Sequence, residues 1–224
     1  MLRAALIIAH KDLRLLVGRS SGLVQAVLLG LVLLFLFSLS QAPGQRLPAQ
    51  SAAAVFWMAS LFCEILVVNA LFFVEESQGA RLALTLSPMP LQAIWLGKAL
   101  ASLVLLLLAQ CLFLPASVAF LGQSFSGDVW PALAMVLLAD WGLVALGALL
   151  GALSQGQAAR ESLLSVVLFP LLLPLLLAAV RGMTQALGGP PEPLENWFMT
   201  AGAFDLMFTA AALFLFPYVY GGDA

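Results

Sequence analysis

Charged residues are scarce in this sequence of 224 residues: lysine and arginine number 9, aspartate and glutamate number 11, and together they make up 9% of the chain. Hydrophobic residues make up 63%. The polar intervals between the apolar runs are roughly 10–20 residues long, which is too short for any of them to bury a core of its own. The composition therefore excludes a separate soluble domain and predicts one transmembrane domain over residues 1–224.

Residues that perform catalysis or bind metals are also scarce. His10 is the single histidine, and the two cysteines, Cys63 and Cys111, lie in apolar runs, where we expect them to be small buried side chains. The sequence has no H-E-x-x-H motif, and no serine or cysteine has a histidine at membrane depth to activate it. We therefore predict a non-catalytic protein with no metal site. The net charge of −2 gives no reason to expect a nucleic-acid partner.

Long apolar runs predict an all-α protein with six transmembrane helices. The third run is longer than a bilayer needs, so it either tilts or begins as an interfacial segment before Lys98. The predicted spans are residues 21–40, 52–73, 93–121, 130–153, 162–180 and 199–220.

The distribution of basic residues predicts the orientation. Most of the 9 lysines and arginines fall on one side if both termini are cytoplasmic, as the positive-inside rule requires. We therefore expect a multi-pass membrane protein with both termini cytoplasmic, in which Arg46, Arg181 and the interfacial Trp197 lie on the external side. The predicted cytoplasmic residues are Arg3, Lys11, Arg14, Arg19, Arg81, Lys98 and Arg160.

The first 19 residues form an amphipathic pattern. On a helix, Arg3, His10 and Arg14 cluster on one face, which favours a helix lying in the cytoplasmic interface over a cleaved signal peptide. Such a helix meets anionic headgroups, and Arg3, Lys11 and Arg14 offer contacts to a partner. The predicted apolar face consists of Leu2, Leu6, Ala9, Leu13 and Leu16.

The connection "VEESQGARLALTLSPMPL" concentrates polar residues, glycine and proline between the second and third spans. Its start, "EESQGAR", predicts a helical turn, and Gly79 allows the close approach of another backbone. Pro88 disfavours helix at Ser87, so a short helix should stop there. Residues 74–92 are therefore either a small rigid protrusion that a partner contacts or an ordinary solvated loop.

Three acids, Glu64, Asp140 and Asp205, fall inside predicted spans. An ionised group at mid-bilayer costs at least about 2.5 kcal/mol, and no lysine or arginine lies at matching depth. We expect the acids to be neutral or to face a wet cavity. They form either a polar, protonation-sensitive path or simple hydrogen bonds to neighbouring helices.

The fifth and fourth spans carry helix-distorting and close-packing patterns. Pro170 and Pro174 share one face and predict a kink that is either static or a hinge. Gly147 and Gly151 form a G-x-x-x-G pattern that lets another helix approach closely, most simply within the same subunit.

The run from Phe72 to Lys98, with Glu75, Gly79, "SPMP" and "LGK", resembles the cytoplasmic motif of the heme exporter protein B family. The proline-paired "LLSVVLFPLLLPLLLAAV" of residues 163–180 is similar to the fifth span of that family. The resemblance covers nearly the whole chain. One departure is that Arg81, Leu82 and Ala83 stand where the family often has an acid after the first leucine.

The resemblance implies an ABC-2-type permease subunit of the bacterial inner membrane that delivers haem to a periplasmic chaperone in cytochrome c maturation. It implies a second copy of the chain, two copies of a separate ABC ATPase and a haem-handling membrane protein as partners. Haem is then a cargo, no cofactor is bound directly, and ATP binds the partner, since the sequence lacks G-x-x-x-x-G-K-[ST]. The residues expected to dock the ATPase are Glu75, Glu76, Gly79, Arg81, Pro88 and Pro90.

Two other functions stay open at the level of the sequence. One is an ABC-2 permease for a lipid, glycan or drug. The other is a proton-coupled secondary transporter that uses Glu64, Asp140 and Asp205, although no internal repeat supports it.

Overall fold

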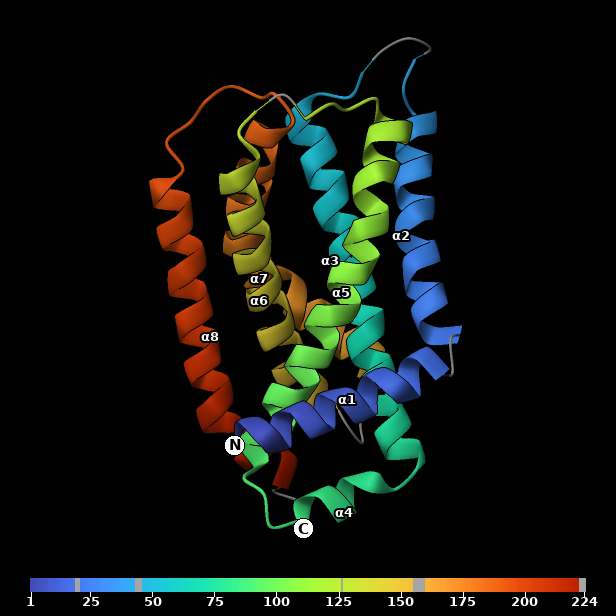
Figure 1. Cartoon of the computed structure of the whole chain (residues 1–224), viewed down its shortest axis with the longest axis vertical. Coiled ribbons are helices and arrows are strands. Elements are labelled where there is room, and N and C mark those ends of the chain that lie inside the picture. The colour runs from blue at the N-terminus through green and yellow to red at the C-terminus, as the bar shows by residue number, and fades with distance from the viewer. Residues whose placement is uncertain (19–20, 43–45, 126, 155–159, 222–224) are drawn as a thin grey trace.

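The computed structural model describes residues 1–18, 21–42, 46–125, 127–154 and 160–221. In these ranges every regular element is a helix, so the predicted all-α class is confirmed (Figure 1). The helices are α1 (Leu2–Gly18), α2 (Ser21–Leu39), α3 (Ala49–Ser77), α4 (Ala80–Thr85), α5 (Leu91–Leu121), α6 (Val129–Leu153), α7 (Arg160–Ala186) and α8 (Glu195–Gly221).

Six helices of the described chain, α2, α3 and α5–α8, are long and apolar enough to cross a membrane, which confirms the predicted spans. Several run beyond the predicted ends, because a helix continues into the interface as long as no residue breaks it. In particular, α5 is one helix from Leu91, so the alternative of a separate segment before Lys98 is wrong. Of the six, α3 and α6 are the most buried and α2 and α8 the most exposed to the surroundings.

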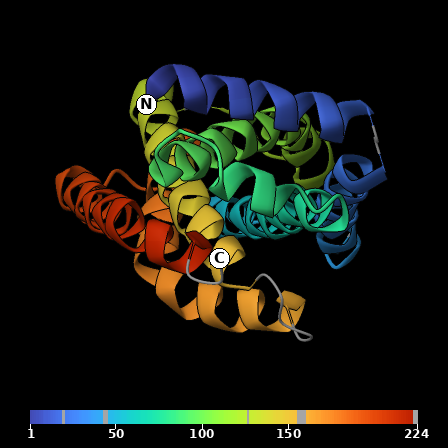
Figure 2. The same ribbon diagram turned by 90° about the horizontal axis from the view of Figure 1, so that it is seen from below.

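The six spanning helices run side by side, and α1 lies across one end of the bundle (Figure 1). We call this the α1 end. The short helix α4 and the last turn of α8 lie at the same end (Figures 1 and 2). The loops that follow α2, α5 and α7 lie at the opposite end.

Helix α1 packs along α5 through small side chains. A Cβ built on Gly97 of α5 would lie 2.7 Å from Ile8 Cβ and 2.8 Å from the carbonyl of Ala5, so the two helices are in close contact there. Of the predicted apolar face, Ala9 and Leu16 are buried against the bundle, whereas Leu2 and Leu6 are exposed. The contact of this face with the membrane interface stays a prediction. Arg19, the end of the predicted segment, lies outside the described residues.

The connection between α3 and α5 is a turn, a short helix and a second turn. Gly79 adopts a left-handed φ of 63° between α3 and α4, so the predicted continuous helical turn over "EESQGAR" is wrong. Within this chain a Cβ on Gly79 would meet nothing within 4 Å, so the glycine is required here by its positive φ. The close approach of a partner's backbone at Gly79 stays a prediction. The predicted stop before Ser87 is confirmed, because α4 ends at Thr85.

The G-x-x-x-G pattern of α6 packs on α3 of the same chain, as predicted. A Cβ on Gly147 would lie 3.2 Å from Val68, and one on Gly151 would lie 2.6 Å from both Phe72 and Val68. Because glycine has no side chain, α6 can approach α3 closely at these two positions.

We expect Gly151→Ala to lower stability by about 1–3 kcal/mol, because the added methyl group overpacks the contact with Phe72 and Val68. The matched control is Gly202→Ala on α8, where a Cβ meets nothing within 4 Å and alanine favours the helix. Thermal unfolding of the purified protein in detergent measures both. Equal destabilisation by the two variants would contradict the close packing of α3 and α6.

Candidate functional site

Two cations and two anions from three helices meet at the α1 end. Lys98 Nζ on α5 lies 3.0 Å from Glu75 Oε2 on α3 and 3.6 Å from Asp12 Oδ2 on α1. Lys11 Nζ lies 2.9 Å from Asp12 Oδ1 and 3.6 Å from Glu75 Oε1. We call Lys11, Asp12, Lys98, Glu75 and its partner Tyr220 the α1-end ion network. Each charge in it faces charges of the opposite sign.

The inner half of this network is buried from solvent. Lys98 is 0% exposed and Glu75 is 2% exposed. Buried ions are tolerated when other groups satisfy them. Lys98 also donates to the Leu71 carbonyl at 3.4 Å and lies 4.4 Å from the centre of the Phe72 ring, and Tyr220 Oη on α8 donates to Glu75 Oε2 at 2.9 Å. The network therefore ties α1, α3, α5 and α8 together.

Lys11 forms the solvent-facing edge of the network. Burial lowers the pKa of Lys11, but the neighbouring carboxylates of Asp12 and Glu75 outweigh it, so the net shift of this pKa is upward. A raised lysine pKa keeps the ion pairs intact at neutral pH. Their contribution to stability is lost only as the pH rises through that raised value.

Helix α4 is joined to the same network through α8. The Arg81 guanidinium donates to the Tyr220 carbonyl at 3.0 Å and to the Val219 carbonyl at 3.5 Å, and it lies 5.4 Å from the centre of the Tyr220 ring. These carbonyls belong to the last turn of α8, where the helix itself provides no donors. Arg81 thus connects α4 directly to the end of α8.

The residues predicted to dock an ATPase all lie at the α1 end, but they do not share one surface. Glu76, Gly79, Pro88 and Pro90 are exposed, and Arg81 is half-buried against α8. Glu75 instead points into the ion network, where Lys98 compensates its charge, so its expected place on an exposed surface is corrected. On α1, Arg3 and Arg14 are exposed while Lys11 joins the network.

Analysis of the sequence missed Asp12 and Tyr220. Asp12 is the one acid of α1, and it lies on the buried face beside the cation Lys11, a position that only a partner charge explains. Tyr220 is one of two tyrosines in the chain, and it lies in the last turn of an apolar helix. Lys98, which binds Asp12, and Glu75, which binds Tyr220, come from distant parts of the sequence.

The three intramembrane acids lie in the core of the bundle. Ser102 donates to Glu64 at 2.5 Å and Gln110 donates to Asp140 at 2.7 Å, whereas Asp205 is buried beside α6. No lysine or arginine among the described residues forms an ion pair with any of these acids, as the sequence indicated.

The two prolines of α7 do not interrupt it. The helix continues through Pro170 and Pro174 to Ala186. The hinge therefore stays a prediction.

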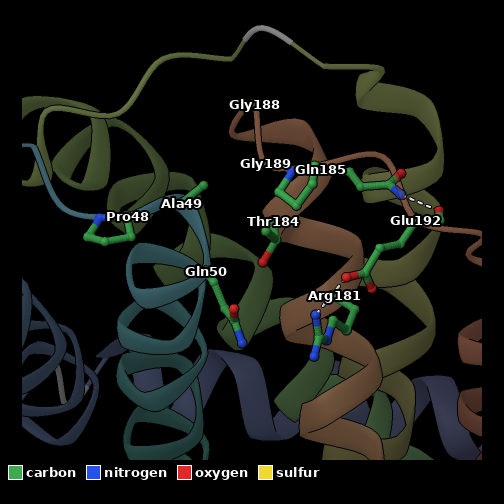
Figure 3. A pocket seen from close by; sticks show the side chains of 10 residues that line it. Pro48, Ala49, Gln50, Arg181, Thr184, Gln185, Gly188, Gly189 and Glu192 are labelled. Carbon is green, nitrogen blue, oxygen red and sulfur yellow. Dashed lines mark hydrogen bonds and ion pairs between the residues drawn. The ribbon is translucent and has the colours of Figure 1, made fainter.

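A pocket of about 300 Å³ lies at the opposite end of the bundle (Figure 3). Arg181 on α7 forms a 2.9 Å ion pair with Glu192 and lies 5.8 Å from the centre of the Trp197 ring. Gln185 donates to the Glu192 carbonyl, so the loop after α7 is fastened to that helix (Figure 3). The charged groups of this pocket are thus already paired with each other.

Comparison with known proteins places these features in a family. The model of the family described as CcmB protein matches residues 3–220. The chain belongs to the CcmB family. It is 27% identical to "Heme exporter protein B" of Pseudomonas aeruginosa over 93% of this chain and 90% of the relative. For the proteins of the same name from Haemophilus influenzae and Paracoccus denitrificans, the identities are 28% and 29%, over 92% and 93% of this chain and 95% and 92% of the relatives.

Within this CcmB protein, we expect Lys98→Met to destabilise the fold by about 3–5 kcal/mol, because it leaves Glu75 and Asp12 buried with less compensation. Lys11→Met, at a lysine whose side chain is 38% exposed, should cost less than about 1 kcal/mol. Denaturant unfolding of both variants in detergent tests the difference. If Lys98→Met were as mild as Lys11→Met, the buried ion pair would not hold the α1 end together.

Proposed function

We propose that the chain is the permease subunit of an ABC-type complex that exports haem and delivers it to a periplasmic chaperone in cytochrome c maturation. The observation that carries this proposal is the family match over residues 3–220, together with full-length relatives that bear the name heme exporter protein B. The permease itself is non-catalytic. Haem is its cargo, and ATP is hydrolysed by a separate ATPase subunit.

The exposed side of α4 suits an ATPase contact. Leu82 is 60% exposed and Leu86 is 75% exposed, and Glu76 at the end of α3 and Pro88 after α4 are exposed as well. Exposed leucines on a short, firmly held helix are typical of a surface that inserts into a groove of another protein. We call Glu76, Leu82, Leu86 and Pro88 the α4 docking surface. Arg3 and Arg14 on α1 supply a second contact at the same end.

The ion network explains how movement of this surface would reach the membrane. Arg81 holds α4 to the end of α8, Tyr220 joins α8 to Glu75, and Lys98 joins Glu75 to Asp12. Closure of two ATPase subunits on ATP would move α4, and with it α8, α3, α5 and α1 as one unit. A second copy of the chain would move in the same way, which gives a rigid-body switch between two arrangements.

The placement of basic residues supports the proposed orientation. Arg3, Arg14 and Arg81 lie at the α1 end, whereas Arg46 and Arg181 lie at the opposite end. By the positive-inside rule the α1 end faces the cytoplasm. Both termini are then cytoplasmic, the protein lies in the bacterial inner membrane, and the partner that handles haem contacts the assembly within this membrane.

We expect a variant with Glu76→Ala, Leu82→Ser and Leu86→Ser to lose the ATPase. Burying one leucine contributes about 1.5–3 kcal/mol, so removing two should weaken binding by more than about tenfold. The test is co-purification from cells that express this chain with the ABC ATPase encoded in the same genome. The matched control is Phe125→Ser with Glu195→Ala, which changes exposed residues at the opposite end.

Retention of the ATPase by a folded docking variant would contradict the assignment of the α4 docking surface. The cargo is tested separately by the haem content of the periplasmic chaperone in cells that lack this chain. Unchanged haem loading there would contradict haem export even if the ATPase binds.

A further inference from the structure

All three intramembrane acids converge on α6. A Cβ on Gly147 of α6 would lie 3.3 Å from Glu64 Oε1, and one on Gly142 would lie 2.5 Å from Asp205 Oδ1. Asp140 belongs to α6 itself and faces Gln110 of α5. The glycines of α6 thus provide room for carboxyl groups from α3 and α8, and the acids lie at helix junctions rather than against lipid.

Each acid at the junction of α3, α5 and α6 is satisfied on one oxygen only. Glu64 Oε1 accepts from Ser102 at 2.5 Å, and Asp140 Oδ1 accepts from Gln110 Nε2 at 2.7 Å. Both acids are 0% exposed, yet Glu64 Oε2 and Asp140 Oδ2 are buried without a hydrogen-bond partner. Gln110, at 3% exposed, has the same property, since its carbonyl Oε1 is also buried and unpartnered.

An ionised carboxylate does not fit this environment. It is an acceptor only, and here each group is offered one neutral donor. The nearby cation, Lys98, is bound to Glu75 and Asp12. A charge at this depth costs at least about 2.5 kcal/mol, and two negative charges would also repel each other.

A proton removes this conflict. It neutralises the carboxyl group and converts the unpartnered oxygen into a donor. For Asp140 a fitting acceptor is Gln110 Oε1, which belongs to the amide that already donates to Asp140. A proton on Asp140 Oδ2 could therefore be donated to Gln110 Oε1, which gives both of these buried atoms a hydrogen-bond partner. The carboxyl group of Asp140 and the amide group of Gln110 would then be joined by two hydrogen bonds.

We propose that Glu64, Gln110 and Asp140 form a proton-binding site at the junction of α3, α5 and α6. Both carboxyl groups carry a proton in the packed state, and release of the protons loosens α6 from α3 and α5. The ligand is the proton itself. This inference goes beyond the proposed function, because it depends on neither the cargo nor the ATPase.

Few other ionisable groups of the described chain face this site. Cys63 is buried next to Glu64 on α3, and Asp205 faces α6 from α8 with both oxygens unpartnered. Lys98 lies one turn from Ser102 on α5 and belongs to the α1-end ion network. Among the side chains that the structure describes on these helices, the remaining charged groups lie toward the two ends: Glu75, Glu76, Arg181 and Glu195.

The direct test is infrared spectroscopy of the full chain in lipid nanodiscs at neutral pH, in which a protonated carboxyl group gives its own C=O stretching band. We expect this band in the wild type, a weaker band in Glu64→Gln and in Asp140→Asn, and a still weaker one in the double variant. Glu76→Gln, at an exposed residue, is the matched control and should leave the band unchanged. Identical bands in the wild type and the double variant would overturn the proposal.

The second test follows thermal unfolding as the pH is raised from about 6 to about 9. A proton held in the folded state and released on unfolding makes stability fall with rising pH. The wild type should therefore lose stability across this range, and the double amide variant should lose clearly less. An equal loss in both would overturn the proposal, as would failure of both single variants to fold, since an amide replaces a neutral carboxyl group but not a carboxylate.

Discussion

The buried ion pair between Lys98 and Glu75 is the interaction on which the α1 end of this protein depends. Lys98 is 0% exposed, and a buried lysine charge is tolerated only if neighbouring groups of opposite charge compensate it. Two carboxylates and a carbonyl oxygen surround it, and they come from α1 and α3. This requirement fixes an otherwise peripheral helix, α1, against the bundle.

The same requirement explains how the polar groups are ordered along the interface of α3 and α5. Full charges occur at the α1 end, where Lys98 meets Glu75. One turn inward Ser102 meets Glu64, and further in Gln110 meets Ser60 and Asp140. Lys98 and Gln110 are separated by about 18 Å of helix. The change from ion pairs to hydrogen bonds with the neutral donors Ser102 and Gln110 follows the rising cost of charge with depth in the membrane.

Helix α6 links this polar interface to the rest of the bundle. Its glycines bring α6 close to α3 and leave room for Glu64 and Asp205 beside it. Close packing of this kind resists gradual deformation, so a helix of this type moves as a rigid body or remains in place. Force delivered at α4 and protonation inside the bundle would therefore act on the same set of helices, one through α8 and the other through α6.

The sequence by itself determined the features that depend on local composition. Six apolar runs specified six spans, Pro88 marked the end of the short helix before Ser87, and the motif from Phe72 to Lys98 identified the family. Only the tertiary structure decided which way each side chain points. It turned Glu75 inward, exposed Leu2 and Leu6, and gave Asp12 and Tyr220 their partners. Hydropathy and helix breakers act within a few residues of the chain, whereas these pairings depend on the rotation of each helix against neighbours distant in sequence.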